Sequence, residues 1–282
     1  MTGASLQEVA IEPIALNAPV SRNKERIASL ILLCLLLGGW QAVTWLFDIP
    51  PIIFPSPVNV LSWLIQGFSV PVTSSSSFIY NLGVTALEAL IGFFLGSIAG
   101  IGGGFALAHW ERAGRVMYPY IQAFNALPKV AIAPLMIVWL GYGLEPKIMM
   151  AAILVFFPML VNCIAGYHSV DPDRIDLARS CNASNFQIFK KIIIPSALPF
   201  IFAGLHMAVV LAMLGAIVGE FVGATSGLGV LLLQYNNNLQ VGGVFAILVV
   251  LGAVGFILSV LVQKIESHFC FWSKREKNFG QL

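Results

Sequence analysis

The sequence predicts an all-α membrane protein with about six transmembrane helices. Of its 282 residues, 58% are hydrophobic and only 10% are charged, too few charges to cover a soluble protein of this length. The apolar residues also form long runs, and about 20 mostly apolar residues are enough for a helix to cross a bilayer. Six runs reach that length: 27–47, 82–108, 119–141, 147–167, 197–222 and 243–263.

The distribution of basic residues supports six spans independently. Except for Lys129 and Lys147, every lysine and arginine falls in segments that six spans place on one side: 1–26, 109–118, 168–196 and 264–282. The alternate segments, 48–81 and 223–242, contain none. Because cytoplasmic loops are enriched in Lys and Arg, both termini and the 168–196 loop are predicted to be cytoplasmic, in a bacterial-type plasma membrane.

The domain organisation follows from these spans. We expect a cytoplasmic tail over 1–26, a transmembrane domain over 27–263 and a second cytoplasmic tail over 264–282. The first apolar run is long enough to remain as a span, so a cleaved signal peptide is not expected. The four cysteines lack metal-ligand spacing and are predicted to be free thiols, with no metal site.

The segment 48–81 is predicted to lie on the outer surface. Ser56 followed by Pro57 is a helix-start signal, and apolar residues follow at helical spacing, so a short surface helix is expected there. The serine-rich stretch 73–77 then forms a flexible link to the second span.

The second span carries a glycine at every fourth position: Gly92, Gly96, Gly100 and Gly104. Such a ridge lets another helix backbone approach closely, which favours packing in lipid. The sequence GIGGG at 100–104 is not a phosphate-binding loop, because no strand precedes it and no Gly-Lys-Ser/Thr follows.

Ionisable residues within the spans are the first candidates for a functional site, because a charge in a bilayer is costly and usually faces a cavity or a partner. Four lie inside or at the ends of spans: Glu88, Lys129, His206 and Glu220. Glu88 has an alternative place near the outer interface. A neutral, hydrogen-bonded histidine is the simpler interpretation of His206.

The segment 124–134 is predicted to line a translocation pathway. It places a lysine between two prolines, and broken helices in membranes are tolerated where they line water or protein. The candidate pathway residues are Asn125, Pro128, Lys129, Pro134, His206 and Glu220.

The stretch DLARSCNASNFQIFKKIIIPSALP, residues 176–199, is polar and basic within an otherwise apolar chain. Apolar residues from Leu177 to Ile192 recur at roughly helical spacing, and Pro195 and Pro199 are expected to interrupt the helix and redirect the chain. Two interpretations fit these residues: a helix lying on the membrane surface, and a docking helix for a partner protein.

This stretch resembles the cytoplasmic-loop motif of binding-protein-dependent ABC importer permeases. That motif reads Glu-Ala-Ala, three residues, Gly, nine residues, Ile, one residue, Leu-Pro. Asp176, Leu177 and Ala178 stand at its first three positions, with Leu177 in place of alanine. Asn182 replaces the glycine, and Ile192 and the pair Ile194-Pro195 stand at its end. Asparagine tolerates a left-handed backbone, so a turn at Asn182 is expected to survive.

The resemblance covers roughly residues 50–272. The passages FNALPKVAIAPLMIVWLGYG (124–143), FFPMLVNCIAGYHSVDPD (156–173), ALPFIFAGLHMA (197–208) and VGEFVGATSGLG (218–229) are similar to the nitrate/sulfonate(taurine)/bicarbonate-type branch. It implies a type I ABC importer permease fold whose coupling helix docks on an ATPase subunit. The docking residues it implies are Asp176, Leu177, Ala178, Asn182, Ala183, Ser184, Phe186 and Pro195.

The resemblance also implies the partners. The chain has no Gly-x-x-x-x-Gly-Lys-Ser/Thr loop, so ATP and Mg²⁺ are expected on a separate ATPase subunit, with no cofactor bound by this chain. An extracytoplasmic solute-binding protein would deliver the solute. Six spans are few for a complete path, which favours a homodimer or pairing with a second permease.

Two other function classes fit the sequence less well. A stand-alone transporter driven by an ion gradient would show an inverted repeat with paired broken helices, and only one broken segment is evident. An intramembrane enzyme lacks support because no His-Glu-x-x-His or Gly-x-Ser-x-Gly motif is present. The expected solute is a small organic or inorganic anion such as a sulfonate, delivered by the binding protein.

Overall fold

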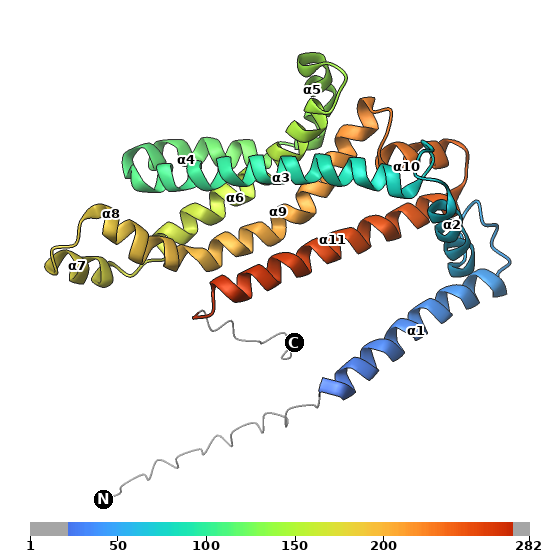
Figure 1. The fold of residues 1–282 in the computed structure, drawn as a ribbon, viewed down its shortest axis with the longest axis horizontal. Helices are drawn as coiled ribbons and strands as arrows, with labels where there is room; N and C mark the ends of the chain where they lie inside the picture. Colours follow the sequence, from blue (N-terminus) through green and yellow to red (C-terminus); the bar gives the residue numbers. More distant parts are fainter. Residues whose placement is uncertain (1–21, 273–282) are drawn as a thin grey trace, which may run out of the picture.

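The protein is an assembly of helices, and the computed structural model describes residues 22–272, with side chains from residue 26. No strand occurs within 22–272. Helices α3 (Phe78–His109), α6 (Glu145–His168) and α9 (Ile194–Gly223) pack together as the centre of the molecule. Figure 1 shows them running between two ends, one carrying α7 and α8 and the other carrying α10 and α2. We call these the loop end and the α10 end.

Close approach of the central helices is made possible by glycine. A Cβ atom at Gly96 would lie 2.5 Å from the carbonyl oxygen of Ala152, and one at Gly100 would lie 2.6 Å from the Cβ of Met159. On the other side of α6, a Cβ at Gly215 of α9 would lie 2.5 Å from the Cα of Ala151. The glycine ridge predicted from the sequence is therefore confirmed as an intrachain contact of α3 with α6.

The remaining helices surround this centre. Helix α11 (Val241–Phe269) packs against α9, and α2 (Pro57–Ser69) and the short α10 (Leu228–Asn237) pack against α11. The short helix predicted to start after Ser56 is confirmed as α2, whose first turn is capped by Ser56 accepting from the Asn59 N–H at 3.2 Å. Helix α1 (Arg22–Leu46) diverges from the body and contacts it mainly at its C-terminal end, near α2.

The third predicted span is broken. Instead of one helix over 119–141, α4 (Glu111–Ala126) is followed by the 3-10 turn η1 (Lys129–Ile132) and α5 (Ala133–Leu140), bent by 81°. Pro128 lacks an N–H and forces Leu127 into extended backbone, so the helix ends there. Five described helices are long and apolar enough to cross a membrane, and six spans result if the bent pair is one.

Three boundaries also differ from the sequence prediction. The expected loop 109–118 is mostly helical, because α4 starts at Glu111 directly after Trp110. The expected tails 1–26 and 264–282 are partly helical as well, since α1 begins at Arg22 and α11 runs to Phe269. The rest of the two tails, 1–21 and 273–282, lies outside the described residues.

Candidate functional site

The segment 168–196 at the loop end forms two short helices joined by a tight turn. Helix α7 (Pro172–Ser180) starts with Asp171, whose side chain accepts from the Asp173 N–H at 3.0 Å. The chain then turns at Asn182, whose φ of +57° is a left-handed value that asparagine adopts more easily than most residues. The prediction that a turn survives at Asn182 is confirmed.

Helix α8 (Asn185–Ile188) begins at a capping box. Ser184 accepts from the Gln187 N–H at 3.3 Å, and the Gln187 side chain accepts from the Ser184 N–H at 2.8 Å. These two bonds satisfy backbone donors that would otherwise be unpaired at a helix start. The expectation of one continuous helix through residues 177–192 is therefore wrong, because Asn182 and Ser184 end one helix and start another.

The prolines do not redirect the chain as expected. Helix α8 continues through five residues of π-helix, η2 (Phe189–Ile193), directly into α9, so that residues 185–223 form one helical run. Pro195 cannot bond to the carbonyl of Lys191 and would crowd it. The wider π turn just before Pro195 accommodates this defect, as π-bulges commonly do at helix irregularities.

The loop is fixed to the ends of the central helices by a small apolar cluster. Val170, Ile188 and Ile193 are buried in it, and Phe105 of α3 and Tyr167 of α6 pack against them. The ring centroids of Phe105 and Phe189 lie 5.3 Å apart in an edge-to-face arrangement. Packing therefore connects the loop to α3 and α6, and a continuous helix connects α8 to α9.

Several predicted docking residues are exposed at the loop. Leu177 is 68% exposed and Phe186 is 70% exposed, although both are large apolar side chains. Asp176, Asn182 and Ser184 are also exposed, and Ala178, Ala183 and Pro195 are half-buried. Asp176 accepts a hydrogen bond from Arg179 at 3.3 Å within α7, and both side chains remain largely in solvent.

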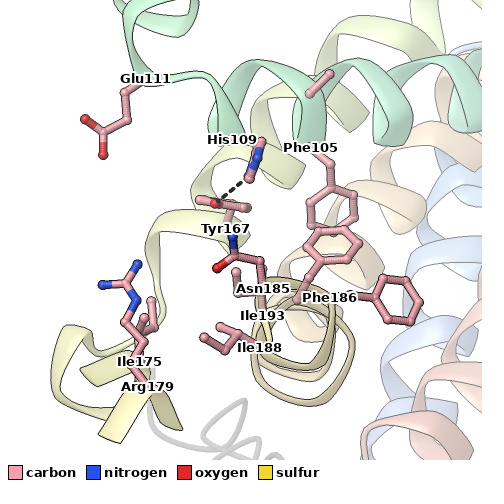
Figure 2. Close-up of a pocket in the computed structure, with 12 residues that line it drawn as sticks. Phe105, His109, Glu111, Tyr167, Ile175, Arg179, Asn185, Phe186, Ile188 and Ile193 are labelled. Carbon is pink, nitrogen blue, oxygen red and sulfur yellow. Dashed lines mark hydrogen bonds between the residues drawn. The ribbon is translucent and has the colours of Figure 1, made fainter. Parts of the chain in front are cut away.

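A cavity of about 680 Å³ opens between this loop and the ends of α3 and α6. Figure 2 shows Phe105, His109 and Tyr167 on one side and Arg179 of α7 on the other, with Phe186 at the α8 wall. His109 Nδ1 and the Tyr167 hydroxyl lie 3.4 Å apart, which joins α3 to α6 beside the cavity. Its lining includes the aromatic side chains of Phe105 and Tyr167 and the charged side chains of Glu111 and Arg179.

A second group of functional candidates lies buried toward the α10 end. Lys147 Nζ of α6 donates to Glu88 Oε1 of α3 at 3.0 Å, and the two side chains are 6% and 0% exposed. Glu88 is therefore fully buried in the helix bundle. The pairing with Lys147 makes this burial possible, because a lone charge there would be very costly.

Glu220 of α9 secures the turn between α9 and α10. Its carboxylate accepts from the Thr85 hydroxyl at 2.6 Å and from the Gly229 N–H at 2.5 Å. The Leu228 N–H donates to the Thr85 hydroxyl at 2.8 Å, and the Gly227 N–H donates to Asn81 Oδ1 at 2.7 Å. The turn is thereby hydrogen-bonded to α3, and its φ of +124° at Gly227 favours glycine.

The sequence analysis missed Lys147, Asn81 and Thr85. The signal for Lys147 was available, since a lysine at the edge of an apolar run requires a nearby acid, and Glu88 and Glu220 are the acids that the six predicted spans contain. Asn81 and Thr85 gave no comparable signal, because small polar residues are common in membrane helices.

The predicted pathway residues separate into two groups. Asn125, Pro128 and Pro134 are exposed on the broken segment, and Lys129 is half-buried there. Lys129 Nζ donates to the backbone oxygen of Asn125 at 2.8 Å and to its side-chain oxygen at 3.0 Å, and lies 5.1 Å from the centre of the Phe157 ring. In contrast, Glu220 is 1% exposed, and His206 Nε2 lies 2.8 Å from Glu266 Oε2.

Comparisons with known proteins decide the family. The model of the binding-protein-dependent transport system inner membrane component matches residues 92–269, which include α6, the loop and α9. The chain belongs to this family. The family match covers the loop motif that the sequence analysis singled out, and the predicted resemblance is confirmed.

Curated relatives of this permease cover nearly its whole length. A probable ABC transporter permease protein of Haemophilus influenzae is 34% identical over 86% of this chain and 96% of the relative. The riboflavin transport system permease RibX of Chloroflexus aurantiacus is 33% identical over 90% of this chain and 97% of that relative. The taurine transport system permease TauC of Escherichia coli is 28% identical over 85% of this chain and 87% of that relative.

A solved structure supports the fold. The inward-facing MetNI methionine ABC transporter matches with a TM-score of 0.59 at 18% identity, covering 68% of this permease and 95% of that chain. The predicted type I ABC importer permease fold is therefore confirmed, as an all-α membrane protein. Cys34, Cys163 and Cys181 are free thiols, as the sequence predicts.

We predict that Lys147→Met lowers the thermal stability of the permease strongly, because it leaves Glu88 buried without a counter-charge. Removing one partner of a buried pair costs about 3–5 kcal/mol. The double variant Glu88→Gln/Lys147→Met, which removes both charges, should recover most of the loss. Thermal unfolding of the detergent-purified variants measures both. Equal stability of Lys147→Met and the wild type would contradict a buried pair.

Proposed function

We propose that this permease works in an ATP-driven importer in which a separate ATPase subunit, carrying ATP and Mg²⁺, docks on the loop of α7 and α8. The observation that carries the proposal is the exposure of Leu177 on α7 and of Phe186 on α8, because α8 continues as one helical run into α9. Large apolar side chains in the polar loop of a membrane protein favour a protein contact. Asp176 adds a charge that would orient the partner.

The same proposal places the loop and both termini in the cytoplasm. The concentration of Lys and Arg in 168–196 and the tails supports this orientation. The α10 end, with the α9–α10 turn, then faces the extracytoplasmic solute-binding protein. This permease does not hydrolyse ATP itself, and the free energy of hydrolysis on the ATPase reaches it through the loop.

We further propose that two permease subunits, as a homodimer or with a second permease, enclose the solute path. The residues of the broken segment, Asn125, Pro128, Lys129 and Pro134, would line it. The exposure of Asn125, Pro128 and Pro134 in a single chain supports this role, because a backbone break at membrane depth is tolerated where it lines a cavity or protein. Alternating access would exchange two arrangements of these subunits.

The proposed solute is a small anion such as a sulfonate. Lys129 supports this class, because both of its hydrogen-bond acceptors on Asn125 are uncharged and leave its positive charge uncompensated. Among the relatives, SsuC of Bacillus subtilis is described as an aliphatic sulfonates permease and TauC as a taurine permease, whereas ThiX of Halalkalibacterium halodurans is described as a formylaminopyrimidine permease.

Replacing both exposed apolar side chains at the loop is expected to detach the ATPase. Truncating an anchor at the centre of an interface typically costs 2 kcal/mol or more, which is roughly 30-fold in affinity. We expect Leu177→Ala/Phe186→Ala to lose the ATPase on co-purification while the permease remains at normal membrane level. Lys190→Ala, an exposed change on the same helical run, is the matched control. Retention of the ATPase and of transport by the double variant would refute docking at this loop.

Lys129→Met is expected to reduce solute uptake by about tenfold or more, with normal assembly with the ATPase. A hydrogen bond to a charged group contributes about 1.5–3 kcal/mol, and methionine cannot form it. Lys129→Arg keeps the charge and should retain more activity than Lys129→Met. Initial uptake rates in membrane vesicles measure the effect, and unchanged rates for Lys129→Met would remove this residue from the pathway.

A further inference from the structure

A second cavity of about 680 Å³ lies on the other side of the loop. It is bounded by α7, by η2 with the start of α9, and by the residues that follow α11. Its walls thus come from the loop and from the ends of two membrane-spanning helices. The lining includes Arg174, Cys181, Lys191, Ile192, Ser196 and Trp272.

The cavity carries positive charge without an acidic partner. Arg174 of α7 and Lys191 of η2 both line it, and neither has a carboxylate within 4 Å in the described part of the chain. Arg179, on the same helix as Arg174, differs because it is paired with Asp176. Two uncompensated cations facing one cavity favour an anionic occupant.

The cavity also lies where a membrane span meets its polar flank. Ser196 is near the start of the apolar helix α9, and Trp272 follows the last residue of α11 by three positions. Tryptophan is enriched at the level of lipid headgroups, where its ring is apolar and its N–H is polar. Trp272 is 46% exposed, so its ring is available to a lipid.

We propose that this cavity binds the headgroup of an anionic phospholipid. The phosphate would pair with Arg174 and Lys191, the Ser196 hydroxyl would donate to it, and Trp272 would contact the glycerol and the upper acyl chains. Basic pockets between spans on the cytoplasmic side are suited to such headgroups. The inference rests on the cytoplasmic orientation of the loop given above.

A bound lipid would act on the loop directly. Leu177 and Ala178 line the same cavity, so an occupant would brace α7 against the start of α9. The lipid would then hold the docking loop in place, and ATPase-coupled transport would depend on the anionic lipid content of the membrane.

Lipid retention by the purified full-length permease, without the ATPase, tests the site. The permease is incorporated in nanodiscs of phosphatidylcholine with phosphatidylglycerol, released into mild detergent and examined by native mass spectrometry. We expect the wild type to retain one phosphatidylglycerol, and Arg174→Gln/Lys191→Gln to reduce this retention by at least about tenfold. Trp272→Ala should reduce it less. Lys190→Gln/Lys264→Gln, which removes the same charge from exposed positions outside the cavity, should retain the lipid.

Each alternative occupant gives a different result. Thermal unfolding in nanodiscs separates a lipid from free phosphate. If inorganic phosphate added to phosphatidylcholine nanodiscs raises the melting temperature of the wild type as much as phosphatidylglycerol does, the site binds free phosphate and the lipid proposal fails. If the Arg174→Gln/Lys191→Gln variant keeps its lipid but loses the ATPase on co-purification, the cavity belongs to the ATPase interface and the proposal also fails. Because lipid retention is measured without the ATPase, failure of docking at Leu177 and Phe186 does not affect it.

Discussion

The close contact of α3, α6 and α9 is the constraint on which the rest of the structure depends. In a bilayer, apolar side chains gain little by leaving lipid, so helices associate through close packing and buried polar bonds. Glycines of α3 and α9 allow both helices to approach the backbone of α6, where a Cβ atom would lie within 3 Å of the backbone or side chain of α6. This contact brings Lys147 within reach of Glu88, and it also brings Thr85 within reach of Glu220.

The two ends of the molecule are linked by this centre. At the loop end, Ile188 and Ile193 pack against α3 and α6, and at the α10 end Glu220 and Asn81 hold the α9–α10 turn on α3. The helical run 185–223 joins the two, and at 1.5 Å per residue it is roughly 58 Å long, enough to cross the whole membrane. Movement of α8 would therefore reach the opposite end of the molecule through one helical run, whose irregular part is the π-helical turn before Pro195.

The sequence predicted the features that depend on composition and residue spacing. It did not predict those that depend on local capping bonds, on a π-helical turn or on a partner far away in the sequence. Apolar run lengths gave five of the six spans, and the spacing from Asp176 to Pro195 located the loop. Two features needed the fold: the split of that loop into α7 and α8, decided by local bonds at Ser184, and the continuation of the helix through Pro195, which needs the π turn. The partner of Glu88 was missed because Lys147 is 59 residues away and belongs to another helix.

Spin-label distances within one permease subunit test the rigid link most directly. Labels at Asn185 and Val222, both exposed and near opposite ends of the helical run, would be placed in one copy of an assembled transporter with the second copy unlabelled. We expect the same distribution of label-to-label distances with and without ATP, because the helical run 185–223 moves as one body. A distance that changes with ATP would show that the helix bends at η2 and would contradict the rigid link.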